Sequence, residues 1–95
     1  MRSYELTFIV RPELDEEGVT AVTDKVTSAI TALGAQVEGV KRWGKRRLAY
    51  PIRRQVEGHY VLVNADIETS SLPELERTLR LNEDILRHLL VRPEQ

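Results

Sequence analysis

The clearest strand pattern in the chain is Gly58-His59-Tyr60-Val61-Leu62-Val63-Asn64-Ala65-Asp66-Ile67-Glu68. Small apolar side chains alternate there with larger or polar ones. One face would carry Val61, Val63, Ala65 and Ile67, and the other Tyr60, Leu62, Asn64, Asp66 and Glu68. A period of two rich in branched residues is typical of a strand buried on one side. We therefore expect a strand over residues 58–68.

Three further segments are predicted to form strands. Residues 4–10 alternate in the same way, with Tyr4, Leu6, Phe8 and Val10 on one face and Ser3, Glu5, Thr7 and Ile9 on the other. The Arg11-Pro12-Glu13 segment ends this strand, because proline cannot continue a ladder. Residues 35–43 form another strand with Val37 and Val40 inward, and their spacing of three predicts a bulge near Gly39. Residues 85–91 form the last one, after a turn at 82–84.

Two segments have helical periodicity. A helix from about 15 to 33 is indicated by apolar spacings of three and four, formed by Val19, Val22, Val26, Ala29, Ile30 and Leu33. The acids Asp15-Glu16-Glu17 suit the positive end of its dipole, and Gly34 suits the left-handed residue after its last turn. Leu72, Leu75 and Leu79 indicate a short second helix, with Ser71 and Glu74 spaced as a capping box.

The predicted order is strand, helix, strand, strand, helix, strand. Two split β-α-β units with right-handed crossovers give a four-stranded antiparallel sheet with both helices on one face. This is an α+β, ferredoxin-like βαββαβ sandwich. The length of 95 residues allows one such domain over residues 1–95.

Composition excludes several classes of protein. Hydrophobic residues make up 41% and charged residues 31%, which fits a globular domain. There is no cysteine, so neither a disulfide nor a thiolate site is possible. The sequence has no membrane-length apolar run and no signal-peptide pattern, so we expect a cytoplasmic protein that does not bind a membrane.

The positive charge is concentrated in one place. Residues 1–40 carry three basic and seven acidic side chains, and residues 55–95 carry four and eight. The basic segment, residues 41–54, has no acid and seven cations: Lys41, Arg42, Lys45, Arg46, Arg47, Arg53 and Arg54. It joins the second and third strands, so we expect a long hairpin arm that projects from the body.

Such an arm favours a polyanionic ligand. Cations that contact phosphates release condensed counterions, and arginine forks match phosphate oxygens. Trp43 and Tyr50 lie among the cations and could stack on unpaired bases. The alternative is a solvated charged hairpin that only blunts an edge strand, with Leu48 and Tyr50 as anchors that hold its shape.

No pattern in the sequence indicates catalysis. His59 and His88 have no neighbouring nucleophile or acid in a triad-like arrangement, and the five glycines form no phosphate-binding loop. We interpret the acids at 15–17 as helix-dipole partners rather than metal ligands. The residues after the first strand are acidic, unlike the phosphate cradle that an acylphosphatase needs. We therefore expect no enzyme activity, cofactor, metal or small-molecule substrate.

Several segments resemble the bacterial small-subunit ribosomal protein S-six family. They are Arg2-Ser3-Tyr4-Glu5, Leu33-Gly34-Ala35, Gly44-Lys45-Arg46-Arg47-Leu48-Ala49-Tyr50-Pro51-Ile52, Gly58-His59-Tyr60 and Arg80-Leu81-Asn82. The resemblance implies a structural protein that binds 16S rRNA in the central domain, or platform, of the small subunit. It also implies small-subunit protein S-eighteen as the partner. We expect this partner at the helix-free sheet face and the edge of the second strand.

The resemblance and the charge pattern together name the expected rRNA-binding residues. The family motif covers Arg2, Tyr4, Arg46, Arg47, Tyr50 and Arg87. The basic segment adds Lys41, Arg42, Trp43, Lys45, Arg53 and Arg54. Trp43 does not match the family pattern, so its role is argued from chemistry alone. A competing interpretation is a module that binds single-stranded RNA on the open sheet face, although only Tyr60 offers an aromatic ring there.

Overall fold

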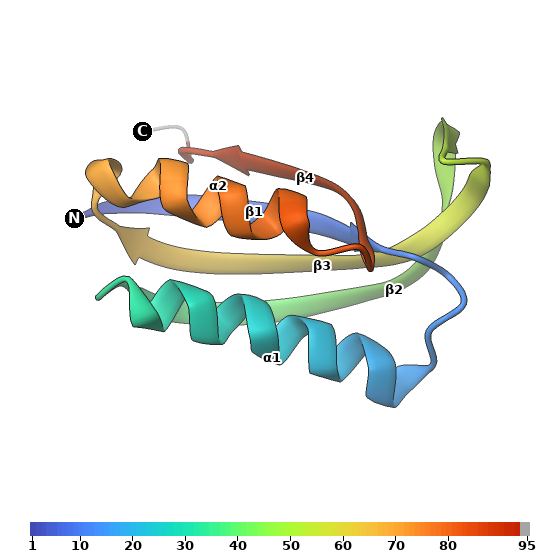
Figure 1. Ribbon diagram of the computed structural model, residues 1–95, viewed down its shortest axis with the longest axis horizontal. Coiled ribbons are helices and arrows are strands. Elements are labelled where there is room, and N and C mark those ends of the chain that lie inside the picture. Colours follow the sequence, from blue (N-terminus) through green and yellow to red (C-terminus); the bar gives the residue numbers. More distant parts are fainter. Residues whose placement is uncertain (94–95) are drawn as a thin grey trace.

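Both helices cover the same face of one sheet in the computed structural model, which describes residues 1–93 (Figure 1). The elements in chain order are β1 (Arg2–Val10), α1 (Glu16–Ala32), β2 (Gln36–Ile52), β3 (Gln55–Ile67), the 3-10 turn η1 (Thr69–Ser71), α2 (Leu72–Leu81) and β4 (Ile85–Val91). The predicted succession of strands and helices is confirmed. Positions 94–95 of the predicted domain lie outside the described residues.

The sheet has the order β2-β3-β1-β4, and all three strand pairs are antiparallel. The pairing of β1 with β3 is regular from Arg2 opposite Ile67 to Val10 opposite His59. This is the ferredoxin-like arrangement expected from the sequence. The two edge strands are β2 and β4, and no helix among residues 1–93 is long and apolar enough to span a membrane.

The core lies between the sheet and the helices. The alternating faces predicted for β1 and β3 are confirmed, because their inward residues are buried while most of their outward neighbours remain accessible. Ile9 is the exception among the outward residues of β1, since it is buried in a second, smaller cluster with Leu48 and Leu86. The largest fully buried side chains are Phe8, Leu6, Ile30, Ile67, Leu75 and Leu79. Each such side chain contributes roughly 1.5–3 kcal/mol of transfer free energy. This packing holds the sheet firmly in place, so the β2–β3 hairpin extends from a rigid base.

The ends of α1 follow the sequence closely. Asp15 is the N-cap, and its carboxylate accepts a 2.8 Å hydrogen bond from the amide of Gly18. Gly34 has φ +83°, the left-handed conformation predicted for it. The buried stripe additionally contains Thr23, whose hydroxyl donates to the carbonyl of Val19 at 2.8 Å. This bond satisfies the polar group and lets it sit in the core.

Three local expectations need correction. The second strand is not confined to residues 35–43 but continues to Ile52, and the third begins at Gln55. Val40 lies opposite the inward Val63 but remains 41% exposed, because β2 is an edge strand. Ser71 precedes α2 without any side-chain capping bond, so the predicted capping box does not form. The bulge near Gly39 is confirmed by a register shift between Val37 and Gly39.

The bulge brings two carboxyls together. A hydrogen bond and charge repulsion from Asp66 raise the pKa of Glu38. When the pKa of an acid is higher in the folded than in the unfolded state, the unfolded chain loses its proton first as pH rises. The free energy of unfolding therefore falls once pH passes the pKa of the acid in the unfolded chain. Glu38→Gln is therefore expected to raise the melting temperature slightly at pH 7. Thermal unfolding at several pH values would check this, since the gain should vanish below about pH 4, where unfolded glutamate is protonated.

Candidate nucleic-acid interface

The β2–β3 hairpin continues past the end of β1, from Arg46 opposite Gly58 to the turn, and bends there (Figure 1). The arm is here defined as residues 41–58, which includes the part of β2 inside the sheet that leads into this extension. The last residue of β1, Val10, pairs with His59, so the strands beyond it lack that neighbour. The hairpin closes at Arg53 and Arg54, which both have left-handed backbones with φ 51° and 69°. The basic segment, predicted as a hairpin arm between the second and third strands, is thus a continuation of β2 up to the turn.

The arm does not project freely, as the sequence led us to expect, but bends against the sheet. Gly44 has φ +86° at a register shift in β2, which is the conformational freedom this bend needs. Beyond the bend, Leu48 is buried in a small cluster with Ile9 and Leu86. Leu48 is therefore an anchor of the arm, one of the roles considered for it.

Two of the seven cations bind groups outside the basic segment. The guanidinium of Arg42 donates to Glu16 and Thr20 of α1, at 2.8 Å in each case. That of Arg53 donates to the backbone carbonyls of Glu83 and Ile85, at 3.2 and 3.4 Å. Both bring distant parts of the chain to the arm, and neither guanidinium is free for a ligand unless these bonds break.

Most of the remaining positive charge is unpaired. Within residues 1–93, no hydrogen bond or ion pair involves the side chains of Lys41, Lys45, Arg47 or Arg54, and all four are exposed. Arg46 lies over the ring of Trp43, 5.5 Å from its centroid, and donates to the carbonyl of Trp43 at 3.4 Å. Among these cations, Lys45 acts on a carboxylate of the body, because its charge helps to lower the pKa of Glu13. The arm therefore presents a concentration of cations that form no ion pair with the carboxylates of residues 1–93, apart from that of Arg42 with Glu16.

Each aromatic residue of the basic segment is paired with an arginine. Trp43 is 48% exposed beneath Arg46, and Tyr50 is 54% exposed beside Arg87. The guanidinium of Arg87 donates to the hydroxyl of Tyr50 and lies 5.8 Å from the ring centroid. The fold thus brings Arg87 from β4 to the arm. Tyr50 is too exposed to be a core anchor.

Arg2 and Tyr4 do not join the arm. Arg2 is exposed opposite Ile67, at the far end of the sheet from the hairpin turn. Tyr4 is only 6% exposed, since its ring belongs to the core and its hydroxyl lies 3.3 Å from that of Thr69. A base has no free face of Tyr4 on which to stack. The alternating pattern of β1 had already placed this ring inward.

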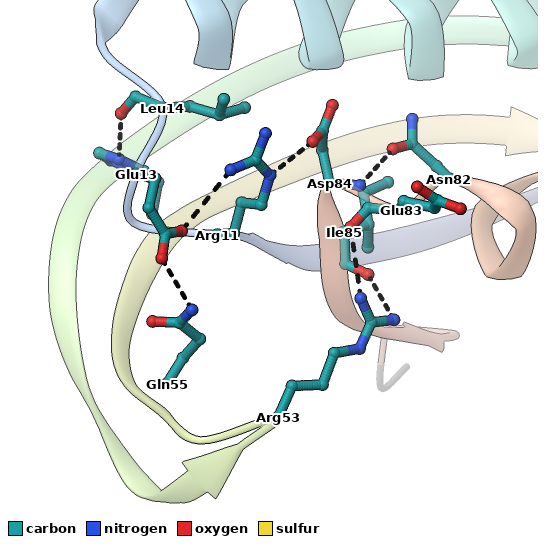
Figure 2. Close-up of polar contacts among 10 residues, drawn as sticks. Arg11, Glu13, Leu14, Arg53, Gln55, Asn82, Glu83, Asp84 and Ile85 are labelled. Atoms are coloured by element: carbon teal, nitrogen blue, oxygen red, sulfur yellow. Dashed lines mark hydrogen bonds and ion pairs between the residues drawn. The ribbon is translucent and has the colours of Figure 1, made fainter.

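Two loops beside the arm are joined by an ionic network that the sequence analysis did not find (Figure 2). Arg11 donates from Nε to Asp84 at 2.6 Å, and this bond raises the pKa of Arg11. Glu13 Oε1 lies 3.7 Å from Nη1 of Arg11, and Glu13 Oε2 accepts a 2.8 Å hydrogen bond from Nε2 of Gln55. Its own backbone amide and Gln55 lower the pKa of Glu13. No local signal could reveal these pairs, because the partners are 42 and 73 residues apart.

Neither histidine lies in a catalytic arrangement. His59 Nε2 is 2.9 Å from the carbonyl of Leu14, and His88 Nε2 is 3.3 Å from Glu76. Residues 1–93 contain no group of three or more acidic, His or Cys side chains able to hold a metal. Of the acids at the start of α1, Asp15 caps the helix and Glu16 binds Arg42.

A shallow groove runs between the arm and the helix-free sheet face. Its lining is mostly apolar and comes from β1, the arm, β3 and β4: Thr7, Ile9, Leu48, Ala49, Tyr50, Ile52, Tyr60, Arg87, His88 and Leu89. Leu89 is 55% exposed there. The basic arm therefore lies next to an accessible apolar surface.

Comparison with known sequences identifies the family. The sequence profile of the family described as Ribosomal protein S6 matches residues 3–92. The chain belongs to this family. A small ribosomal subunit protein bS6 of Moorella thermoacetica is 45% identical over 95 residues, which are 100% of this chain and 97% of that protein. The protein of the same name from Desulforamulus reducens is 45% identical over 92 residues, 97% of each chain.

A solved structure supports the same assignment. The crystal structure of 30S ribosomal protein S6 from Thermotoga maritima matches with a TM-score of 0.91 and 30% identity, covering 97% of this chain and 87% of that one. The resemblance noted in the sequence is thus confirmed. As an S6-family member, this chain is a structural protein of the small ribosomal subunit rather than an enzyme, and it associates with ribosomal RNA.

Proposed function

We propose that the arm of this S6-family protein binds 16S rRNA in the central domain of the small subunit, together with small-subunit protein S-eighteen. One observation carries the proposal: Lys41, Lys45, Arg47 and Arg54 are exposed on one arm, and their side chains make no hydrogen bond or ion pair with residues 1–93. Unpaired cations on a β-hairpin attract phosphates because each contact releases a bound counterion.

The arginine–aromatic pairs extend this surface. Trp43 and Tyr50 offer exposed rings, and stacking on an unpaired base is worth about 1–3 kcal/mol. Arg46 and Arg87 hold these rings and add charge beside them. Phosphate contacts position a protein without reading sequence, so recognition would rest on the shape of the RNA and on the partner protein.

The other predicted residues have different places in the proposal. Arg2 would contact RNA separately, at the opposite end of the sheet, while the ring of Tyr4 supports β1 from the core. We propose that S-eighteen meets the open sheet face along the apolar groove, where Leu89 is accessible. Protein partners favour such apolar surfaces bordered by polar groups.

The salt dependence of RNA binding tests the proposal. The four unpaired cations and Arg46 would engage about five phosphates, so log affinity should fall with log salt at a slope near −3.5 to −4.5. Anisotropy titrations of a labelled central-domain fragment, with S-eighteen present, would measure the slope. A slope near zero would remove the electrostatic account. Footprints on Thr7, Tyr60 and Leu62 instead of the arm would favour binding at the sheet face.

A further inference from the structure

The turn of the arm is built from residues that the backbone disfavours there. A two-residue hairpin with positive φ at both positions is usually made by glycine, asparagine or aspartate. Here both positions are arginine, with φ 51° at Arg53 and 69° at Arg54. Such strain persists where the side chains supply a compensating interaction. The two side chains therefore need an explanation beyond turn formation.

These neighbours have different environments. Arg53 reaches back to the α2–β4 turn, where its two terminal nitrogens donate to the carbonyls of Glu83 and Ile85 (Figure 2). Arg54 is exposed, and its side chain has no hydrogen bond or ion pair with any residue from 1 to 93. One guanidinium faces the protein, and the other faces solvent.

The surface that Arg53 contacts is fixed in place. Arg11 joins the β1–α1 loop to the α2–β4 turn twice, through its side chain to the Asp84 carboxylate at 2.6 Å and through its amide to the Asp84 carbonyl at 2.9 Å. Two residues of β3 bind the same β1–α1 loop. Gln55 donates to Glu13 (Figure 2), and His59 contacts the carbonyl of Leu14. The turn and the returning strand are thus fastened at three residues, Arg53, Gln55 and His59, with Arg53 nearest the tip.

We propose that Arg53 is a positioning residue that latches the tip of the arm to the α2–β4 turn, whereas Arg54 is the phosphate contact. The latch is a property of the free protein. The assignment of Arg54 rests on the proposed function. To bind a phosphate, Arg53 would have to give up its two hydrogen bonds to backbone carbonyls, which would release the tip of the arm. Arg53 therefore stays on the α2–β4 turn and contributes little to the release of counterions from RNA.

A matched pair of variants separates the two roles. Arg53→Gly and Arg54→Gly each remove one positive charge, and glycine suits the left-handed backbone at both positions. Amide hydrogen exchange on the free protein reports how tightly the arm is held. The salt slope of binding to the central-domain RNA fragment reports how many phosphates are neutralised.

In the free protein, Arg53→Gly should speed exchange of the amides of residues 47–57 by about tenfold, which is the loss of one or two charge-assisted hydrogen bonds. Arg54→Gly should leave these rates within about twofold, since it breaks no side-chain contact. Equal exchange in the two variants would overturn the latch, whatever the RNA experiments give.

In RNA binding, Arg54→Gly should reduce the magnitude of the salt slope by about 0.7–0.9. Arg53→Gly should weaken binding while leaving the slope unchanged, because it disorders the arm without removing a phosphate contact. A slope reduced by Arg53→Gly and not by Arg54→Gly would reverse the assignment. A wild-type slope near zero would instead contradict the proposed function and leave the exchange test of the latch intact.

Discussion

Simultaneous Lys45→Ala, Arg47→Ala and Arg54→Ala changes should weaken binding to central-domain rRNA by on the order of a hundredfold at 0.1 M salt. The three side chains are exposed and make no hydrogen bond or ion pair in the described part of the chain, residues 1–93, so each can neutralise a phosphate. Each contact contributes about 0.7–0.9 to the exponent of the salt term, which at this salt is roughly five- to eightfold in affinity. Three independent contacts multiply to the expected loss.

The same experiment should leave the fold intact. These side chains are exposed and make no hydrogen bond among residues 1–93, so circular dichroism and the melting temperature should match those of the wild type. A matched control removes three exposed cations away from the arm, through Lys25→Ala, Arg77→Ala and Arg92→Ala. This control has the same net charge and should lose only a small part of the affinity. Equal losses in the two triple variants would show that net charge, rather than the arm, drives binding.

The number of available cations is where the structure refines the sequence most. Composition alone counts seven in the basic segment, with no acid beside them. The fold withdraws Arg42 and Arg53, through partners 26 and about 30 residues away in the chain. These partners depend on how α1 and the α2–β4 turn pack beside the arm. A charge count along the sequence therefore gives an upper limit on the phosphate contacts, and tertiary structure sets the actual number.

The elements that the sequence predicted well are those with strong periodicity. The strand containing Val61, Val63, Ala65 and Ile67 and the helix after Asp15 depend on burial of one face, which a single segment already displays. The bent arm is different, because Leu48 is buried in a cluster with Ile9 and Leu86, which come from two other strands. The apolar side chain of Leu48 indicated an anchor in the sequence, but it did not indicate toward which surface the arm bends.

The predicted rRNA-binding residues also include some whose position the sequence indicated correctly and some that only the fold could place. The family motif named Tyr4, but the alternation of β1 placed its ring inward, and burial agrees with the alternation. Arg87 is 37 residues from Tyr50 in the sequence, and yet the fold places it against Tyr50 of the arm. Motif similarity identifies residues that a family shares without separating core positions from surface ones. Periodicity supplies that separation when both are applied to the same residue.

Gly58→Ala is expected to destabilise the protein by about 1–3 kcal/mol, the usual cost of adding a methyl group to a packed site. A Cβ atom at Gly58 would lie 2.4 Å from Ile9 Cγ2 and 3.0 Å from the carbonyl oxygen of Val10. Ile9 belongs to the cluster that anchors Leu48, so relief of the clash would move the base of the arm. The melting temperature should fall by roughly 5–20 °C for a domain of this size.

Gly39→Ala provides the matched control for this prediction. A Cβ atom there meets no heavy atom within 4 Å, although Gly39 lies in the neighbouring strand of the same hairpin. Thermal unfolding should show a change within about 0.5 kcal/mol, or a slight gain because alanine has less freedom in the unfolded chain. If both variants melted alike, close packing at Gly58 would not be the reason for glycine there.

A double-mutant cycle then identifies the atoms responsible. Ile9→Ala removes the Cγ2 atom that clashes with a new methyl group and should by itself cost about 2–4 kcal/mol through lost packing. In the double variant, the new methyl group at position 58 partly fills the space that Ile9 leaves. The destabilisation of the double variant should therefore be about 0.5–2 kcal/mol smaller than the sum of the destabilisations of the two single variants. Strict additivity would assign the cost to the Val10 carbonyl instead, since the backbone of β1 cannot move aside as a side chain can.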